Sequence, residues 1–418
     1  MSARSLGRRR LLPSRAATSV AGVLGVVAVL LTGAVGSQAP AVTVDQSYWI
    51  PVGDRVVVRG HGYGHGHGMS QYGAYGAARQ GLTVDQILAF YYPGLTPGTA
   101  GGRVRVLVSA DTTDDLVVSP AAGLTVRDRG AKTSYPLPEI AGVTRWRLGV
   151  ADGRTVVDFL TDRWQRWQPD GKDALVGDGQ FQAKGQPLTL WTPSGSKTYR
   201  GKLRAASPSP GSTARDTVNV LSLDNYLRGV IPYEMPASWH PEAVKAQAVA
   251  ARTYAAWSRA QNRSRYYQIC DTTSCQVYGG LDGEHPLANA AVDATARTVL
   301  MDGGSPAFTQ FSSSSGGWTA AGSASYLVAQ EDPYDAHDAN PVHDWSVQVD
   351  ARRIERAYPA IGELRRIRVT SRDGNGEWYG RVNSLQLDGS RADRTVSGDS
   401  FRWLLGLRST WFSIDQAG

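Results

Sequence analysis

The chain has 418 residues, enough for two or three domains of ordinary size or for one large elaborated domain. Its formal net charge is +7, but five arginines and no acids lie within residues 1–36. Setting those five aside leaves 39 basic residues against 37 acidic ones. This near balance argues against a nucleic acid as the partner of the remaining chain.

Residues 1–36 have the pattern of an export leader. Basic residues as far as Arg15 precede an apolar run from Ala16 to Val35. Small residues at the end of that run suit a signal peptidase, and residues 39–41 are a second candidate cleavage site. An uncleaved leader would act as an anchor, because about 20 apolar residues can span a bilayer. We therefore expect a secreted or cell-envelope protein, membrane-anchored if the leader is kept.

A glycine- and histidine-rich segment, HGYGHGHGMSQ, begins at His61. Its histidines, His61, His65 and His67, have a spacing that can bind a metal. Its glycines let a backbone approach a ligand closely, and they equally suit tight turns in a structural loop. We favour a loop that lines a substrate cleft, with the metal site and the structural loop as alternatives. A helix is predicted over residues 83–92.

The middle of the chain is predicted to be rich in β-strands. Short segments alternate or run apolar between residues 104 and 223, with glycine, proline or aspartate between them. Residues 206–216, ASPSPGSTARD, are predicted to form an exposed loop. The predicted strands are 104–109, 116–119, 124–128, 145–150, 155–160, 188–191 and 218–223.

An isolated carboxylate follows these strands. Glu234 is the only acid between Asp224 and Glu242. Met235 precedes a proline, and a residue in that position is disfavoured from helical conformation, so Met235 should be extended. Glu234 is therefore expected on a turn rather than on a regular helix face.

Residues 241–261 are predicted to form a helix. The segment begins with a proline, contains no glycine and is dense in alanine. Lys245 and Arg252 are seven residues apart and share one face, and Gln247 lies on a neighbouring stripe. A lone carboxylate beside a cationic helix face indicates a site, although an ordinary turn and a solvated helix face give the same pattern.

Cys270 and Cys275 are the only cysteines of the chain. In an oxidising compartment, two cysteines this close favour a short-loop disulfide. Zinc is the alternative, but no histidine lies between His240 and His285 to supply a third ligand nearby.

Residues 311–319, FSSSSGGWT, form a serine-rich turn. The segment lacks the strand-turn-helix context of a G-x-S-x-G nucleophile, and no histidine or aspartate is placed by sequence to activate a serine. We therefore reject a serine hydrolase and expect Ser313 and Ser315 to line a cleft. Further helices are predicted over residues 286–296 and 398–405.

Several of these segments together resemble the stage II sporulation protein D family of peptidoglycan lytic transglycosylases, which also includes amidase-enhancer proteins. The family carries YLRGVVxSEMPASW…EALKAQAVAARTYA, SxSGGxT, FRxxLGLxSxxF and GxGWGHGxGMSQWGA blocks. The matching segments here are 226–230, 234–239, 242–254, 311–319, 398–412 and 59–92.

The order of the blocks differs from the family's. The glycine–histidine block usually comes last, directly after the LGLxSxxF segment, whereas here it comes first. The sequence thus resembles a circular permutation, which is tolerated when chain termini lie close together on the surface. We predict that residues 55–60 and 408–414 are neighbours in space.

The resemblance implies an exported enzyme that cleaves the MurNAc–GlcNAc bond of peptidoglycan glycan strands and leaves 1,6-anhydro-MurNAc ends. Glu234 falls on the proposed catalytic glutamate and would act first as acid and then as base, which requires a pKa raised by burial. No cofactor is expected, with zinc as the alternative. The expected substrate contacts are His65, Ser70, Gln71, Lys245, Gln247, Arg252, Ser313 and Ser315.

Relatives are described as preferring glycans without stem peptides, so a cell-wall amidase is an expected partner and nucleic acid is not. One alternative is a non-catalytic peptidoglycan-binding or amidase-activating protein. Another is a hydrolase in which Asp271, Glu331 or Asp332 supplies a second carboxylate.

The expected fold is α+β, with one catalytic core that holds a glycan-binding cleft and a flanking or inserted β-rich lobe. The expected parts are a leader at 1–36, a glycine/histidine cleft segment at 55–102, the β-rich lobe at 103–205 and the main catalytic core at 217–415.

Overall fold

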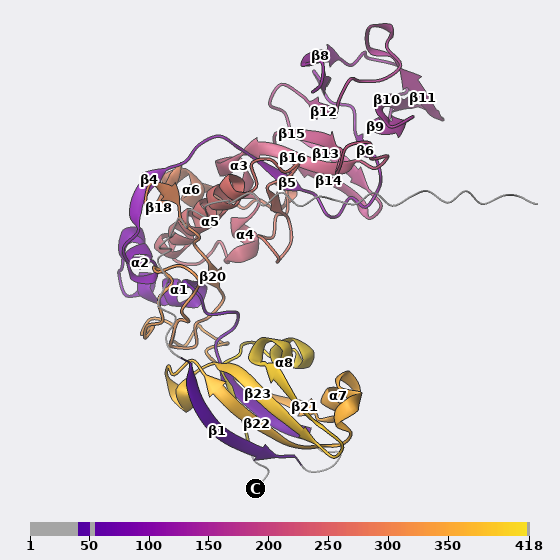
Figure 1. The fold of residues 1–418 in the computed structure, drawn as a ribbon. Helices are drawn as coiled ribbons and strands as arrows, with labels where there is room; N and C mark the ends of the chain where they lie inside the picture. Colours follow the sequence, from indigo (N-terminus) through magenta and orange to yellow (C-terminus); the bar gives the residue numbers. More distant parts are fainter. Residues whose placement is uncertain (1–40, 51–54, 416–418) are drawn as a thin grey trace, which may run out of the picture. The chain divides into compact units, whose positions relative to one another are not determined.

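The computed structural model describes residues 41–50 and 55–415, so the predicted leader at 1–36 lies outside the described residues. The structure contains both helices and many strands, which confirms the predicted α+β class (Figure 1). The described residues belong to one compact unit. No helix among them is long and apolar enough to cross a membrane.

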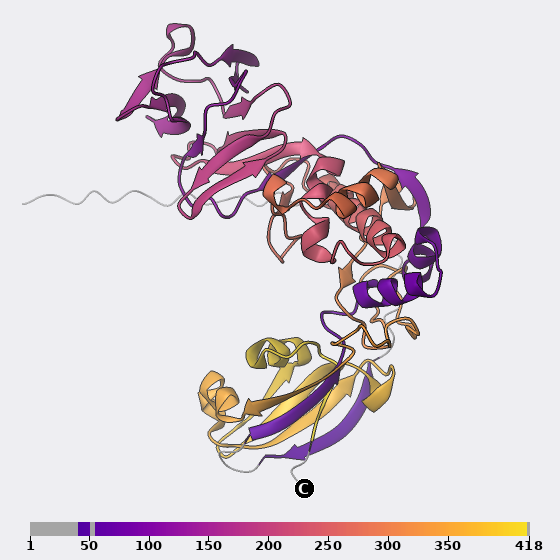
Figure 2. The ribbon, with the colours of Figure 1, turned by 180° about the vertical axis from the view of Figure 1, so that it is seen from behind.

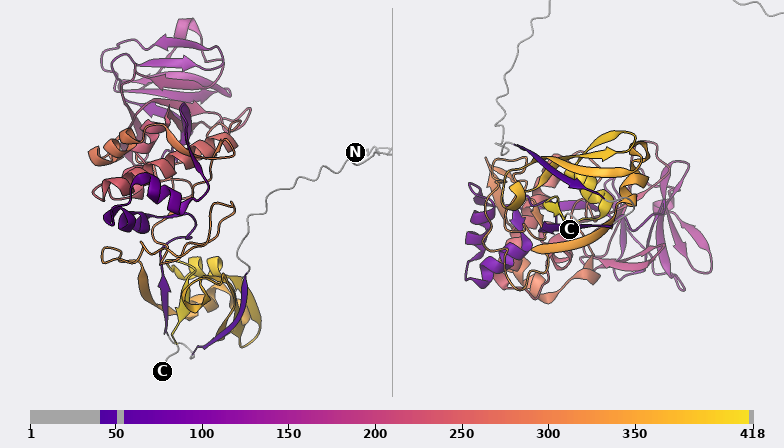
Figure 3. Two further views of the ribbon diagram at one scale, coloured as in Figure 1. Left: turned by 90° about the vertical axis from the view of Figure 1, so that its left-hand side faces the viewer. Right: turned by 90° about the horizontal axis from the view of Figure 1, so that it is seen from below.

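Both ends of the described chain build one lobe, in which the indigo and violet strands β1 and β2 lie beside the yellow strands (Figures 1, 2 and 3). A four-stranded sheet has the order β1-β22-β23-β24, and a three-stranded sheet has the order β21-β2-β25. The elements are β1 (Val42–Trp49), β2 (Arg55–His61), β21 (Asp344–Asp350), α7 (Arg352–Ala357), η3 (Pro359–Ile361), β22 (Leu364–Arg372), η4 (Glu377–Tyr379), β23 (Val382–Gly389), β24 (Asp393–Ser397), α8 (Gly398–Leu405) and β25 (Phe412–Ile414).

The predicted contact between residues 55–60 and 408–414 is confirmed. Strand β2 pairs antiparallel with β25, and Gly60 lies opposite Phe412. The backbone N–H of His61 also donates to the Trp411 carbonyl at 2.9 Å. The two segments, which lie far apart in the sequence, are therefore adjacent in one sheet.

The segment expected as one main core, residues 217–415, is divided between two hydrophobic cores. Apolar side chains from β21 to β25 pack with those of β2 and helices α7 and α8 in a core of their own. The reason is the strand pairing, since β2 and β21 bury their apolar residues, such as Val56 and Val349, against the same core.

A group of helices surrounds α5 in the other core. Its alanines let neighbouring helices approach closely, and most of them are fully buried. The predicted helices at 83–92, 241–261, 286–296 and 398–405 all occur, with ends that differ by at most two residues. The elements are β3 (Met69–Ser70), α1 (Gln71–Arg79), α2 (Val84–Tyr91), β4 (Thr96–Thr99), α3 (Leu223–Arg228), α4 (Ile231–Glu234), α5 (Pro241–Gln261), η2 (Leu281–Gly283), α6 (Pro286–Ala294), β18 (Thr298–Asp302), β19 (Ser305–Pro306) and β20 (Phe311–Ser312).

The β-rich lobe consists of two sheets, ordered β11-β10-β9-β6-β13-β14 and β17-β5-β16-β15-β12-β7-β8. Strands β16 and β17 of the second sheet lie outside the predicted bounds 103–205. Every predicted strand occurs, and the strands that sequence analysis missed are shorter or more polar. The elements are β5 (Arg103–Leu107), β6 (Leu116–Val118), β7 (Thr125–Asp128), β8 (Thr133–Pro136), β9 (Arg145–Ala151), β10 (Arg154–Leu160), β11 (Trp164–Trp167), η1 (Pro169–Gly171), β12 (Gly179–Gln182), β13 (Leu188–Thr192), β14 (Gly195–Tyr199), β15 (Lys202–Ala206), β16 (Asp216–Ser222) and β17 (Ile269–Cys270).

Candidate active site

Glu234 is the last residue of the short helix α4. Pro232 occupies the first turn of this helix, and Met235 is extended with φ −141° and ψ 135°, as predicted for the residue before Pro236. Glu234 was expected on a turn, but it belongs to α4, because its N–H donates to the Val230 carbonyl at 3.2 Å. The two prolines thus confine the helix to one turn and place Glu234 at its end.

Glu234 lines a cavity of about 270 Å³. The walls come from the end of α4, from α5, from the disulfide loop and the residues just after it, from the start of β20, and from the glycine–histidine segment. Among the described residues that line the cavity, Glu234 supplies the one carboxyl group. The lining consists of His65, Glu234, Tyr254, Thr273, Ser274, Cys275, Val277, Gln310 and Phe311.

Burial controls the protonation of Glu234. Loss of hydration raises its pKa to about 7, although the backbone N–H of Val277, which donates to Oε1 at 3.1 Å, favours the charged form. At neutral pH the carboxyl is therefore populated both with and without its proton. A group in this state can donate a proton in one step and accept one in the next.

The predicted substrate role of Arg252 is wrong. The side chain is fully buried, with Nε 2.8 Å from Asp224 Oδ1 and Nη2 donating to the Val292 carbonyl at 3.0 Å. A guanidinium that is enclosed in this way joins α5 to α3 and α6 and does not reach a ligand. Arg252 lies on α5 as predicted, but its side of the helix is covered by α3 and α6.

Lys245 also does not line the Glu234 cavity. Its Nζ donates to Glu242 Oε1 at 2.7 Å, and Glu242 Oε2 accepts from the Val84 N–H at 2.7 Å. These bonds join the first turn of α5 to the first turn of α2. The cationic helix face expected beside Glu234 is therefore occupied by structural contacts.

Gln71 and Gln247 do not line the Glu234 cavity. Gln71 Nε2 donates to the Glu234 carbonyl at 2.8 Å and to Gln247 Oε1 at 3.4 Å. Gln247 is fully buried, and its Nε2 has no hydrogen-bond partner among the described residues. Gln71 thus holds the backbone of Glu234 directly, and Gln247 contacts Gln71.

The serines of the two predicted cleft loops are mostly internal. Ser70 Oγ donates to Asp335 Oδ1 at 2.6 Å, and Ser315 Oγ donates to Asp332 Oδ2 at 2.8 Å. Both serines are about 1% exposed, so the expectation that they bind substrate is wrong. Ser313 is partly exposed, and a substrate contact for it stays a prediction.

His65 forms one wall of the cavity. Burial lowers its pKa to about 3, its Nδ1 accepts from the His67 N–H at 3.0 Å, and the two rings stack with centroids 5.0 Å apart. Near neutral pH this imidazole is therefore uncharged, and it shapes one wall of the cavity. His61 lies elsewhere, between Asp344 and Glu377.

Across residues 41–50 and 55–415, no group of three or more His, Cys, Asp or Glu side chains is arranged to hold a metal ion. Cys270 and Cys275 form a disulfide with their Cα atoms 5.5 Å apart. Cys275 also lines the Glu234 cavity, two residues before the Val277 N–H that contacts Glu234. The disulfide thus fixes one wall of the candidate site.

The three acids considered as a second carboxylate do not line this cavity. Asp271 accepts from the hydroxyl and N–H of Ser109. Asp332 accepts from Tyr91 and Ser315, and burial raises its pKa. Glu331, the residue before Asp332, is exposed.

Sequence analysis missed the residues that complete the cavity. Val277 contributes only its backbone N–H, which no residue type reveals. Tyr254 follows Gln247 by seven residues and therefore shares its stripe of α5, which is the one signal for it in the sequence. Thr273 and Ser274 could not be predicted from the sequence, because they reach the cavity only through the position of the disulfide loop in the fold.

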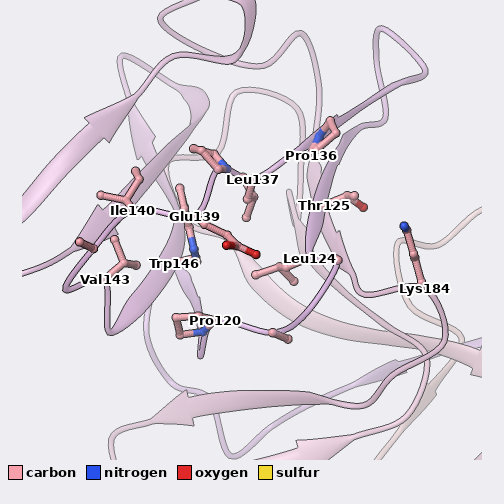
Figure 4. A pocket seen from close by; sticks show the side chains of 14 residues that line it. Pro120, Leu124, Thr125, Pro136, Leu137, Glu139, Ile140, Val143, Trp146 and Lys184 are labelled. Carbon is pink, nitrogen blue, oxygen red and sulfur yellow. The ribbon is translucent and has the colours of Figure 1, made fainter.

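A second cavity, of about 590 Å³, lies in the β-rich lobe (Figure 4). Its walls are mainly apolar, and its charged residues, Glu139 and Lys184, are exposed. Although this cavity is larger, it lacks a buried group that could transfer a proton. Acid–base chemistry is therefore assigned to the smaller cavity.

A mixed α+β scaffold with one buried carboxyl in an otherwise uncharged cavity defines a candidate acid–base site. Residues 212–301, which include Glu234, match the SpoIID family, described as stage II sporulation protein, so the chain contains a SpoIID family domain.

Three relatives of known sequence extend this finding. The amidase enhancer of Bacillus subtilis (strain 168) is 39% identical over 145 residues, 32% of this chain and 19% of that protein. Stage II sporulation protein D of the same organism is 32% identical over 229 residues, 49% of this chain and 64% of that protein. An uncharacterized Brachyspira hyodysenteriae protein is 40% identical over 103 residues, 24% of this chain and 28% of that protein. The chain thus spans less than two thirds of each relative's length, and no solved structure matches it.

Proposed function

We propose that the protein is a peptidoglycan lytic transglycosylase, which cleaves MurNAc–GlcNAc bonds and leaves 1,6-anhydro-MurNAc ends. The observation that carries the proposal is Glu234, the one carboxyl of its cavity, with a pKa raised to about 7. Glycoside hydrolases ordinarily need two carboxylates. One is sufficient when the sugar's own hydroxyl is the nucleophile.

In the proposed reaction, protonated Glu234 gives its proton to the glycosidic oxygen as the bond from MurNAc C1 to that oxygen breaks. The resulting carboxylate accepts the proton of the MurNAc C6 hydroxyl, whose oxygen bonds to C1. Glu234 ends the cycle protonated, and no water is consumed. The Val277 N–H would hold Oε1 in place and stabilise the carboxylate between the two steps.

The proposal extends to the setting of the reaction. We infer that the protein is exported, because residues 1–36 have the sequence pattern of a leader. We also infer a role at the cell wall, with which the family match and the amidase-enhancer relative are consistent. We further propose that its glycan substrate lacks stem peptides, that a cell-wall amidase is a partner, and that the family's block order is permuted. The pairing of β2 with β25 supports the permutation.

A second candidate function is a non-catalytic protein that activates an amidase, favoured by the name of the amidase-enhancer relative. It predicts that the Glu234 cavity is not needed for chemistry. In that case a Glu234→Gln variant would retain its entire activity.

Incubation with glycan strands separates the two functions. Purified residues 37–418 and their Glu234→Gln variant would be incubated with strands treated or not treated with amidase, and both strand binding and strand length measured. The proposed enzyme shortens the strands, and the variant binds them without shortening them. Glu139→Gln, a matched change at an exposed glutamate of the β-rich lobe, should leave cleavage intact. Absence of cleavage by the unaltered protein, with stimulation of an added amidase, would favour the second function.

A further inference from the structure

One face of the seven-stranded sheet concentrates positive charge. The strand register places Arg105, Val220 and Lys202 in one row across β5, β16 and β15. Because alternate residues of a strand share a face, Arg103 lies on the same side as Arg105. The cationic face consists of Arg103, Arg105, Arg127, Lys202 and Arg204, with Arg129 directly after β7.

Acids neutralise only one end of this face. Arg204 forms an ion pair with Asp178, and Asp216 accepts from the Tyr266 hydroxyl. At that same end, Arg105 donates to the carbonyls of residues 263 and 265. Toward the other end, the described ion pairs include neither Arg103, which is exposed, nor Lys202, which is partly exposed.

The cations of this face repel one another. Burial lowers the pKa of Lys202, and the nearby charges of Arg103, Arg127 and Arg129 lower it further. Like charges held this close cost free energy in the unbound protein. A polyanion placed over the face would remove that repulsion.

A cavity of about 590 Å³ opens on the same face. Its charged lining residues are Arg103, Lys184 and Lys202, and polar side chains such as Gln182 and Ser134 lie between them. Lys184 also stands at the edge of the apolar cavity in Figure 4. The open end of the cationic face is thus concave and polar, with donors suited to anionic oxygens.

We propose that the cationic face binds a linear phosphodiester polymer of the cell envelope, one that carries no bases. Arginine forks bind phosphate oxygens in pairs, and a row of cations matches a regularly charged chain. Proteins that bind single-stranded nucleic acids stack bases on aromatic side chains, and no strand residue on this face is aromatic. The envelope setting rests on the proposed function.

The test measures binding of fluorescent poly(glycerol phosphate) to residues 37–418 by anisotropy between 50 and 200 mM NaCl. The variant Arg103→Gln/Arg127→Gln/Lys202→Gln spares Arg105 and Arg204, which make structural bonds. Its matched control, Arg154→Gln/Arg163→Gln/Lys197→Gln, removes the same charge from exposed positions of the six-stranded sheet and its turns.

We expect the face variant to bind about tenfold or more weakly at 50 mM NaCl. The slope of log affinity against log salt should fall by about 2, from three lost phosphate contacts at roughly 0.7 each. The control should bind like the unaltered protein.

Equal binding by the face variant would overturn the proposal. So would equal or tighter binding of a dT20 oligonucleotide, which would indicate a nucleic-acid site, or of poly-L-glutamate, which would indicate charge attraction alone. Glycan cleavage, measured on the same variants, should be unchanged because none of these residues lines the Glu234 cavity. Loss of the proposed polymer binding would therefore be distinguished from loss of the proposed glycan cleavage.

Discussion

Glu234 and Asp332 are both buried carboxyl groups whose pKa is raised by loss of hydration, yet their surroundings differ. Asp332 is about 1% exposed and accepts from Tyr91, Ser315 and a backbone N–H. Glu234 faces a cavity and has one described bond to its carboxylate, from Val277. A raised pKa therefore marks two kinds of group, and access to a ligand separates the catalytic candidate from the structural one.

The largest expected effect is on glycan cleavage when Glu234 is changed to Gln. Loss of a general acid lowers a rate by about 10² to 10⁴-fold. Initial rates on purified glycan strands measure the effect, with Glu139→Gln as the control. A variant that retained a tenth of the rate or more would remove Glu234 from its proposed role.

Asp332→Ala should instead lower stability by about 3 kcal/mol, because the Tyr91 and Ser315 hydroxyls lose their buried acceptor. Denaturant unfolding measures this change. The cleavage rate of the protein that stays folded should change little. A large loss of rate without loss of stability would make Asp332 a second catalytic carboxyl and favour a hydrolase.

Removal of the disulfide should have an intermediate effect. Changing Cys270 and Cys275 to Ser opens a short loop, which costs about 2 kcal/mol in the chain-entropy account. Because Val277, whose N–H donates to Glu234, follows this loop by two residues, the rate should fall as well. Thermal unfolding and initial rates would be compared, and an unchanged rate would show that the loop does not position the acid.

The pH profile should follow the protonation of Glu234. The free enzyme must hold a proton on Glu234, so kcat/KM should fall tenfold per unit as pH rises above about 7. The folded protein also binds this proton more tightly than the unfolded chain, so its contribution to stability is lost as pH rises from 4.5 through 7. Glu234→Gln should remove that loss and be relatively more stable at pH 8. A flat profile with equal stability would contradict the raised pKa.

Local signals in the sequence predicted local structure well. A proline start and an alanine-rich run set the bounds of α5, and Pro236 made Met235 extended, because these effects act within one or two turns. The contacts that side chains make with residues far away in the sequence could not be predicted. Arg252 reads as a surface cation until Asp224 and the Val292 carbonyl enclose it.

Charge shows the same limit on a larger scale. The nearly balanced total charge argues against a nucleic acid as the partner, but a total does not show which charges the strand register brings to one face. The strand order β5-β16-β15-β12-β7 brings the cations of β5, β15 and β7 to one face of the sheet, where fewer acids lie. The sequence therefore predicted the candidate acid but not the cationic face.

The central claim is that one carboxyl cleaves the glycan without water. Digestion of amidase-treated glycan strands in water enriched in oxygen-18, with mass spectrometry of the products, tests it most directly. We predict 1,6-anhydro-MurNAc ends that carry no oxygen-18 and are absent with Glu234→Gln. Reducing ends that carry oxygen-18 would contradict the claim, because they require an attacking water and a second catalytic group.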